Sequence, residues 1–227
     1  MPRANRVYIP GLIWHVTHRC HKKEFLLKFQ KDRSVWIKWL FEAKKRHQAK
    51  ILNYMVTSNH IHLLMVEGEI GSISKTMQLI AGRTAQGYNI RKKRKGAFWE
   101  DRYHACAIES GEYLWRCLIY IDMNMVRAGV VNHPDQWKTC GYHELKEPVH
   151  RYRIIDRQSL HSNLMLKDER DFKDNYSFRL KQALESKGDD KLEISSSRVA
   201  MGSESFVRKV LLKAGMSYKQ KNNIRKA

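Results

Sequence analysis

Residues 51–67 constrain the fold of this chain more than any other stretch. The sequence ILNYMVTSNHIHLLMVE contains two apolar segments separated by the polar pair Ser58-Asn59. This pattern predicts two antiparallel strands, at residues 51–57 and 60–67, joined by a tight turn. A hairpin of this kind is not stable alone in water, so other strands and helices must cover it.

The neighbouring segments supply those elements. Residues 11–19 and 102–108 have the composition of strands, and apolar residues recur at helical spacing over residues 32–46. A second helix is predicted over residues 72–88. The order β-α-β-β-α-β predicts an α+β, ferredoxin-like fold with one antiparallel sheet and both helices on one face. The other face would be open to a ligand.

A third helix is predicted over residues 110–128. Ser110 suits its N-cap and Gly129 its C-cap, while Glu112 lies in the first turn. One stripe of this helix is apolar and predicted to face the core: Leu114, Leu118, Ile121 and Met125. A second stripe is polar: Tyr113, Arg116, Tyr120, Asn124 and Arg127. Tyr120 and Asn124 are one turn apart and can reach the same site.

The sequence becomes more polar beyond residue 145. We therefore predict a first domain at residues 1–145 and a C-terminal extension at 146–227, mostly helical or irregular and of unknown role. Within the extension we predict helices over residues 172–185 and 204–214, a loop at 195–197, and a basic tail at 219–227.

The chain is strongly basic. Its 43 Lys and Arg against 23 Asp and Glu give a formal charge of +20. A surplus of this size favours an anionic partner, above all nucleic acid, because neutralising phosphates releases counterions. A solvated basic surface, a ribosome-like role or a membrane-surface role would also fit the charge alone.

Cysteine usage and apolar runs limit the cellular setting. The four cysteines show no C-x-x-C spacing, so we expect reduced thiols in a cytoplasmic protein, with no disulfide frame or zinc knuckle. The N-terminus has no signal-peptide pattern, and no apolar run approaches the ~18 residues of a membrane span.

His60 and His62 stand out within the predicted hairpin. Alternation along a strand sends both imidazoles to one face, and Ile61, Leu63 and Met65 to the other, toward the helices. Two imidazoles placed in this way can bind one divalent ion, although H-x-H alone is more often a pair of surface histidines. Such a site is incomplete, so a third protein ligand is expected.

Several motifs together resemble a known family. H-I-H after S-N, YIDMNMVRAG on a later helix, WHVTHRC in the first strand and GAFWEDRYHACAIE before the fourth are similar to the REP-associated tyrosine transposases. These belong to the HUH single-strand endonucleases. The resemblance covers about residues 8–145, and Met125 stands where the family often has proline.

The resemblance implies a reaction and a site. His60, His62 and Asn124 would bind Mg²⁺ or Mn²⁺, and Tyr120 would be the nucleophile. Single-stranded DNA would be cut next to a short palindromic hairpin, leaving a 5′-phosphotyrosine and a free 3′-OH. Tyr113 and Tyr88 are rival nucleophiles, but only Tyr120 has an amide at i+4. The protein would act as a monomer or homodimer, associated with the bacterial nucleoid and not with a membrane.

DNA contacts are predicted around the basic run at residues 91–95. Cations there, interleaved with aromatic rings, suit phosphate binding and base stacking. The predicted DNA-binding residues are Arg83, Tyr88, Arg91, Lys92, Lys93, Arg94, Lys95, Trp99, Arg102, Arg116 and Arg127. Arg3 and Arg6 of the N-terminal arm are candidates for reading the foot of a hairpin.

Two other functions remain open at this point. The chain could be a nucleic-acid-binding protein that has kept the fold and lost the chemistry. It could also be a single-strand nuclease that uses metal-activated water. The combination of His60, His62, Tyr120 and Asn124 favours the strand transferase, because a pure binding protein has no need of it.

Overall fold

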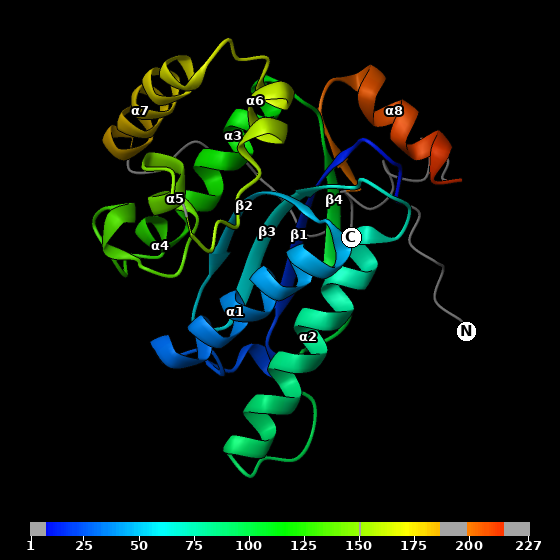
Figure 1. Ribbon diagram of the computed structural model, residues 1–227, viewed down its shortest axis with the longest axis vertical. Coiled ribbons are helices and arrows are strands. Elements are labelled where there is room, and N and C mark those ends of the chain that lie inside the picture. The colour runs from blue at the N-terminus through cyan, green and yellow to red at the C-terminus, as the bar shows by residue number, and fades with distance from the viewer. Residues whose placement is uncertain (1–7, 150, 187–198, 216–227) are drawn as a thin grey trace, which may run out of the picture.

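The computed structural model describes residues 8–149, 151–186 and 199–215, which form a five-stranded sheet covered by helices (Figure 1). The strand order is β2-β3-β1-β4-β5. The bounds are β1 (Ile13–Arg19), β2 (Lys50–Val56), β3 (His60–Val66), β4 (His104–Ile108) and β5 (Ala200–Met201). The first four strands pair antiparallel, which confirms the predicted ferredoxin-like arrangement. The short β5 was not predicted, and it pairs parallel to β4, so the sheet is mixed.

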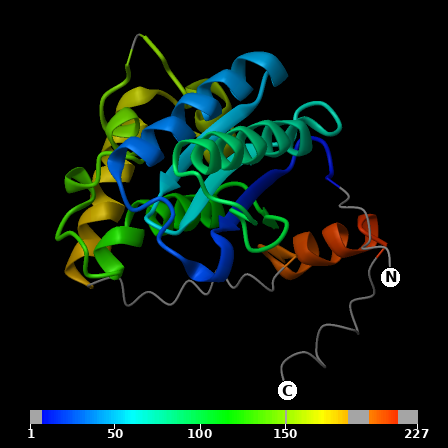
Figure 2. The same ribbon diagram turned by 90° about the horizontal axis from the view of Figure 1, so that it is seen from below.

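Helices α1 (Gln30–His47) and α2 (Ser72–Arg91) lie side by side on one face of the sheet (Figure 2). They are close to the predicted helices, although α2 extends to Arg91. Ile61, Leu63 and Met65 are fully buried, as expected for the strand face that these helices cover.

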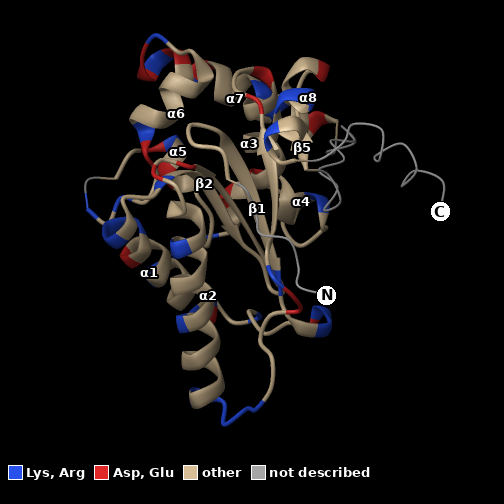
Figure 3. Ribbon diagram, turned by 90° about the vertical axis from the view of Figure 1, so that its right-hand side faces the viewer, with Lys and Arg blue, Asp and Glu red and all other residues tan. Residues whose placement is uncertain are grey.

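The second face of the sheet was predicted to be open, but it is partly covered. Helix α3 (Glu112–Asp122) packs across part of it and contacts β2 and β4 (Figure 3). The physical reason is the apolar stripe of this helix. Leu114, Leu118 and Ile121 are fully buried, because packing on the sheet removes their apolar side chains from water.

The third predicted helix is divided in two. Helix α3 ends at Asp122, and the short α4 (Asn124–Arg127) follows after Met123. The helix begins at Glu112, with Gly111 rather than Ser110 at the N-cap. At the other end Gly129 has φ +66°, the left-handed conformation predicted for a residue that ends a helix.

The remaining elements are short helices between the strands and three helices of the C-terminal extension, α6 to α8. They are η1 (His21–Lys23), η2 (Pro134–Gln136), α5 (Tyr142–Lys146), α6 (Arg157–Leu164), α7 (Glu169–Glu185) and α8 (Glu204–Lys213). Helices α7 and α8 match the two predicted in the extension, whereas α5 and α6 were not predicted. The expected loop at 195–197 and basic tail at 219–227 lie outside the described residues.

The two predicted domains share one hydrophobic core. Buried residues of α6, α7 and β5 belong to the same apolar cluster as the residues of β1 to β4. The hydrophobic core continues across residue 146. The predicted domain boundary there stays a prediction. In the described part of the chain, no helix is long and apolar enough to cross a membrane.

A buried polar network ties α7 to α3. Asp122 accepts a hydrogen bond from Asn53 Nδ2 at 3.0 Å and another from the Tyr176 hydroxyl at 2.7 Å. Burial raises the pKa of Asp122 to about 7. Because Asp122 immediately precedes the turn to Asn124, this network fixes the end of α3 that carries the candidate site.

Replacing Tyr176 with phenylalanine should therefore destabilise the fold. The ring is kept, but one oxygen of the buried Asp122 loses its donor, at a cost of about 1–3 kcal/mol in the free energy of unfolding. Urea denaturation measures this quantity. Tyr152→Phe makes the same change at a side chain that is 78% exposed, so it should shift the value by less than about 0.5 kcal/mol. Equal stability of the two variants would contradict a role for the hydroxyl.

Candidate active site

The second face of the sheet carries a row of imidazoles beneath the end of α3. His62 lies on β3 and is almost completely buried, next to His15 on β1. Their rings are parallel with centroids 5.1 Å apart, and His15 Nε2 lies 2.9 Å from His62 Nδ1. On the other side of His62, Asn124 Nδ2 lies 3.1 Å from Nε2. The start of α4 is thus joined to the sheet through His62.

These contacts fix the tautomer of His62. An amide nitrogen can only donate, so His62 Nε2 accepts from Asn124 and carries the lone pair. The ring proton then lies on His62 Nδ1, which donates to His15 Nε2. His15 therefore holds His62 with the lone pair on Nε2, as outer-shell partners of metal-binding histidines do. A metal ion at Nε2 would take the place of the hydrogen bond from Asn124.

His60 is oriented in the same sense by the turn that precedes it. Its Nδ1 lies 2.7 Å from Asn59 Oδ1 and 2.9 Å from Thr57 Oγ1. The Thr57 hydroxyl donates to the backbone oxygen of His60, so both oxygens act as acceptors toward the ring. Nδ1 therefore carries the proton and Nε2 the lone pair. The His60 and His62 ring centroids are 4.9 Å apart.

Burial keeps all three imidazoles neutral. It lowers the pKa of His15 to about 3 and that of His60 to about 4. The pKa of His62 is also well below its usual value, first through burial and then through the neighbouring His15 and His60. Neutral imidazole is the form that binds a metal ion.

The donor set fits a divalent metal ion with open coordination positions. His60 and His62 carry Nε2 lone pairs, and Asn124 lies at His62 Nε2 with its amide nitrogen toward it. Rotation of the amide would turn Oδ1, the atom able to bind a metal, to the same place. Within the described residues, no group of three or more His, Cys, Asp and Glu is placed to hold a metal. The candidate centre thus depends on an amide as its third ligand. Hard ions such as Mg²⁺ and Mn²⁺ accept such a set when water or phosphate oxygens complete it.

Tyr120 lies beside these candidate ligands in the same chain. Its ring centroid is 5.9 Å from that of His62 and 6.2 Å from that of His15. The Arg127 guanidinium stands over the ring at 3.9 Å and donates to the Tyr120 backbone oxygen at 2.9 Å. Burial lowers the pKa of Arg127, and Tyr120 partly offsets this. The guanidinium thus lies against the ring face in a cation–π contact and keeps a positive charge beside Tyr120.

The rival tyrosines lie elsewhere. Tyr113 is seven residues before Tyr120 on α3, which places it about 10 Å further along the helix axis at the usual rise. The guanidinium of Arg116 stands 5.7 Å from its ring. Tyr88 is on α2, on the other face of the sheet, and packs against Phe98 at 5.0 Å. The geometry therefore favours Tyr120.

The predicted DNA-binding residues divide by location. Arg116 pairs with Glu112 on α3, while Arg127 lies in the site. The others lie on or near α2 and its following loop, where Lys and Arg gather at one end of the molecule (Figure 3). Arg83 stands over Trp39, and Trp99 stacks on His18 and donates to the Ala81 backbone oxygen at 3.0 Å. Arg102 is exposed.

Within the basic run, the arginines and lysines differ. Arg91 pairs with the buried Asp32 and also stands over Tyr88. Arg94 donates to the Ala97 backbone oxygen at 2.9 Å. These arginines shape the loop. The three lysines are exposed and suited to phosphate contacts: Lys92, Lys93 and Lys95. Arg3 and Arg6 lie outside the described residues.

Two residues near the site were not assigned a role from the sequence. His15 orients His62, and Arg19 is an exposed cation at the end of β1, directly opposite His60 in the strand register. Both lie in the WHVTHRC stretch. The alternation of β1 places His15, Thr17 and Arg19 on one face, but only the pairing with β3 shows which face that is.

Comparison with known proteins places the chain in a family. The model of the family described as "Transposase IS200 like" matches residues 9–124, just over half of the 227 residues. None of the curated protein sequences compared with the chain matches it.

Two solved structures are similar to the chain. The structure of a REP-associated tyrosine transposase bound to a REP hairpin aligns with a TM-score of 0.54 at 20% identity, over 69% of this chain and 94% of that one. A candidate transposase from Deinococcus radiodurans R1 aligns at 14% identity over 54% and 96% of the two chains, with a TM-score of 0.38 that is too low to support an argument. The first match confirms the expected fold, and the family match shows that the chain is a member of the IS200-like transposase family.

Proposed function

We propose that this transposase-family protein is a metal-dependent single-strand DNA endonuclease and strand transferase that cuts next to a DNA hairpin. The observation that carries the proposal is the meeting of Tyr120 with His62, Asn124 and His60 within one chain. A hairpin as substrate is supported by the REP hairpin bound to the similar transposase.

The chemistry proposed is a transesterification. The Tyr120 oxygen loses its proton to solvent and forms a bond to the phosphorus of the scissile phosphodiester. The bond from phosphorus to the 3′ oxygen breaks, and that oxygen takes up a proton. The products are a 5′-phosphotyrosine and a free 3′-OH. Because one phosphodiester replaces another, the reverse step can rejoin the strand.

The surrounding side chains have separate roles in this proposal. Arg127 keeps a positive charge against the Tyr120 ring, with its guanidinium carbon 3.9 Å from the ring centroid. His60, His62 and Asn124 would hold Mg²⁺ or Mn²⁺, with His15 fixing the orientation of His62. Such an ion, when bound, draws negative charge from the phosphate oxygens. Arg19, opposite His60, is placed to bind a phosphate.

Covalent trapping tests the proposal. The full chain is incubated with Mn²⁺ and a pool of labelled single strands, each with a short hairpin and a randomised flank, and then denatured before electrophoresis. We expect a protein–DNA adduct that disappears with a chelator and returns when Mn²⁺ is restored. Cleavage without an adduct would indicate a nuclease that uses activated water. A complex that dissociates on denaturation, without cleavage, would indicate the catalytically silent binding protein.

A further inference from the structure

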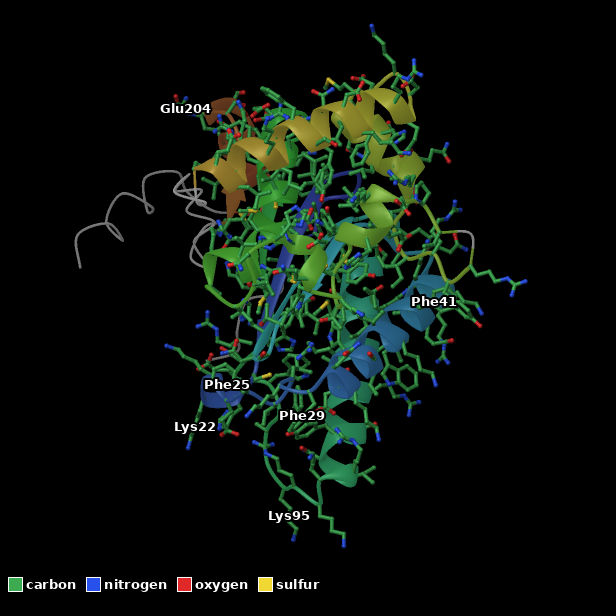
Figure 4. All side chains as sticks on the ribbon, turned by 90° about the vertical axis from the view of Figure 1, so that its left-hand side faces the viewer. Lys22, Phe25, Phe29, Phe41, Lys95 and Glu204 are labelled. Atoms are coloured by element: carbon green, nitrogen blue, oxygen red, sulfur yellow. The ribbon has the colours of Figure 1, made fainter. Side chains whose placement is uncertain are left out.

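A surface beside the candidate active site combines exposed aromatic rings with lysines. It comprises Phe25 and Phe29 with Lys22, Lys23, Lys28 and Lys92, and we call it the aromatic–lysine surface. Figure 4 shows Lys22, Phe25 and Phe29 at the end of the molecule that also carries Lys95. None of the residues before Lys92 in this set was predicted to contact DNA.

The exposure of the two phenylalanines is selective. In the sequence Phe25-Leu26-Leu27-Lys28-Phe29, the leucines are only 7% and 0% exposed, whereas the phenylalanines are 65% and 57% exposed. The core therefore takes up the two leucines of this segment, while the two phenylalanine rings stay exposed to solvent. Arg33 fixes the backbone between them, since it donates to the backbone oxygens of Leu27 and Lys28 at 3.0 and 2.6 Å. The two exposed rings therefore flank a stretch of backbone that is fixed by hydrogen bonds.

The backbone that presents the first two lysines is unusual. Lys22 and Lys23 follow one another with φ +49° and +59°. L-residues other than glycine, asparagine and aspartate rarely adopt this left-handed conformation, and seldom at two successive positions. Backbone outliers of this kind gather at ligand-binding sites. Both lysine side chains are exposed.

One residue connects this surface to the candidate metal ligands. Asn59 donates from Nδ2 to the Lys23 backbone oxygen at 3.2 Å, and its Oδ1 accepts from His60 Nδ1 at 2.7 Å. The Leu27 backbone nitrogen also donates to the Ser58 oxygen at 2.9 Å. The aromatic–lysine surface is thus built on the same turn that orients His60.

The charge of the surface is positive. Lys92 Nζ lies 5.5 Å from the centre of the Phe29 ring, so this surface contains a cation in contact with an aromatic ring. Glu24 is the acidic residue within the segment, and Arg94 pairs with it at 3.7 Å. A chain at +20 offers many cations, but here they lie among rings that are more than half exposed.

We propose that the aromatic–lysine surface binds the single-stranded DNA that flanks the cleavage site. The lysines contact backbone phosphates, and unpaired bases stack on Phe25 and Phe29. Single strands fit better than duplex, because exposed rings can stack only on bases that are not already stacked within a helix. The inference rests on the proposed function for the cleavage site, since only that function makes the bound single strand continue to His60.

The test measures affinity without cleavage. Fluorescence anisotropy of a labelled oligothymidylate of about 12 nucleotides is followed with the full chain in the presence of a chelator. We expect the double variant Phe25→Ala/Phe29→Ala to bind roughly tenfold or more weakly. Affinity for a duplex of the same length should change by less than about twofold, because the lysines still neutralise its phosphates.

Further variants separate stacking from bulk and charge. Phe25→Leu/Phe29→Leu keeps apolar bulk and should bind as weakly as the alanine variant, while Phe25→Trp/Phe29→Trp should retain affinity. Lys22→Gln/Lys23→Gln should reduce the slope of log affinity against log salt by about 0.7 for each phosphate that the variant no longer neutralises. Phe178→Ala is the matched control on α7, because this ring is 62% exposed. It should leave affinity unchanged.

Three results would overturn the inference. They are unchanged single-strand affinity in the alanine variant, full affinity in the leucine variant, and an equal decrease in affinity for single strand and duplex. A dimer that the alanine variant converts to a monomer would show instead that the surface binds a second copy of the chain. The outcome does not depend on Tyr120 chemistry: a normal adduct with unchanged flank affinity would reject this surface and leave the proposed function standing.

Discussion

Tyr120→Phe should abolish the covalent protein–DNA adduct and leave DNA affinity within about twofold of the original. Removing the hydroxyl removes the only atom of this side chain that can attack phosphorus. The ring stays, so the contacts with His62, His15 and Arg127 are retained and the fold should not change. Trapping on a hairpin-bearing strand with Mn²⁺ gives the first quantity, and anisotropy gives the second.

The matched controls for this variant are the rival tyrosines. Tyr113→Phe and Tyr88→Phe remove hydroxyls of the same kind from α3 and α2. Each should form the adduct at a rate close to that of the unmodified chain. If Tyr120→Phe still forms the adduct while Tyr113→Phe does not, the nucleophile has been assigned to the wrong turn of α3.

His60→Ala and His62→Ala should each weaken Mn²⁺ binding by at least about 100-fold and reduce adduct formation to a similar extent, since each removes a proposed ligand and not merely its support. Isothermal titration calorimetry measures the affinity directly, without reference to activity. His60 is the cleaner position, because it is less buried than His62 and leaves a smaller cavity. Unfolding midpoints show whether each variant retains its fold.

His15→Phe gives a graded comparison. It keeps an aromatic ring beside His62 but removes the acceptor for Nδ1–H, so Mn²⁺ affinity should fall about 10-fold to 100-fold. His143→Ala on the exposed side of α5 is the control and should bind Mn²⁺ normally. Unchanged Mn²⁺ affinity in both His60→Ala and His62→Ala would rule out the proposed metal centre.

The parts of the site that depend on local geometry could be predicted from the sequence. Alternation along one strand places His60 and His62 on the same face. Helical periodicity brings Tyr120 and Asn124 together, even though the helix is interrupted at Met123. Each of these pairs is close in sequence, so its geometry depends little on the rest of the fold.

The features of the structure that depend on contacts between distant segments could not be predicted from the sequence. His15 reaches His62 only through the register of β1 against β3, although the two residues are 47 positions apart in sequence. The two-residue β5 joins β4 from a segment almost a hundred residues later, which no local pattern indicates. The exposure of Phe25 and Phe29 was also unpredictable, because composition does not tell which apolar residues of a short segment the core accepts.

The most direct measurement is to map the covalent bond. The adduct is trapped on a strand labelled at either end, digested with protease and nuclease, and analysed by mass spectrometry. We predict a single modified peptide, carrying a nucleotide joined through its 5′ phosphate to Tyr120, with the 3′-OH on the released fragment. Attachment to any other residue, or through a 3′ phosphate, would contradict the central claim.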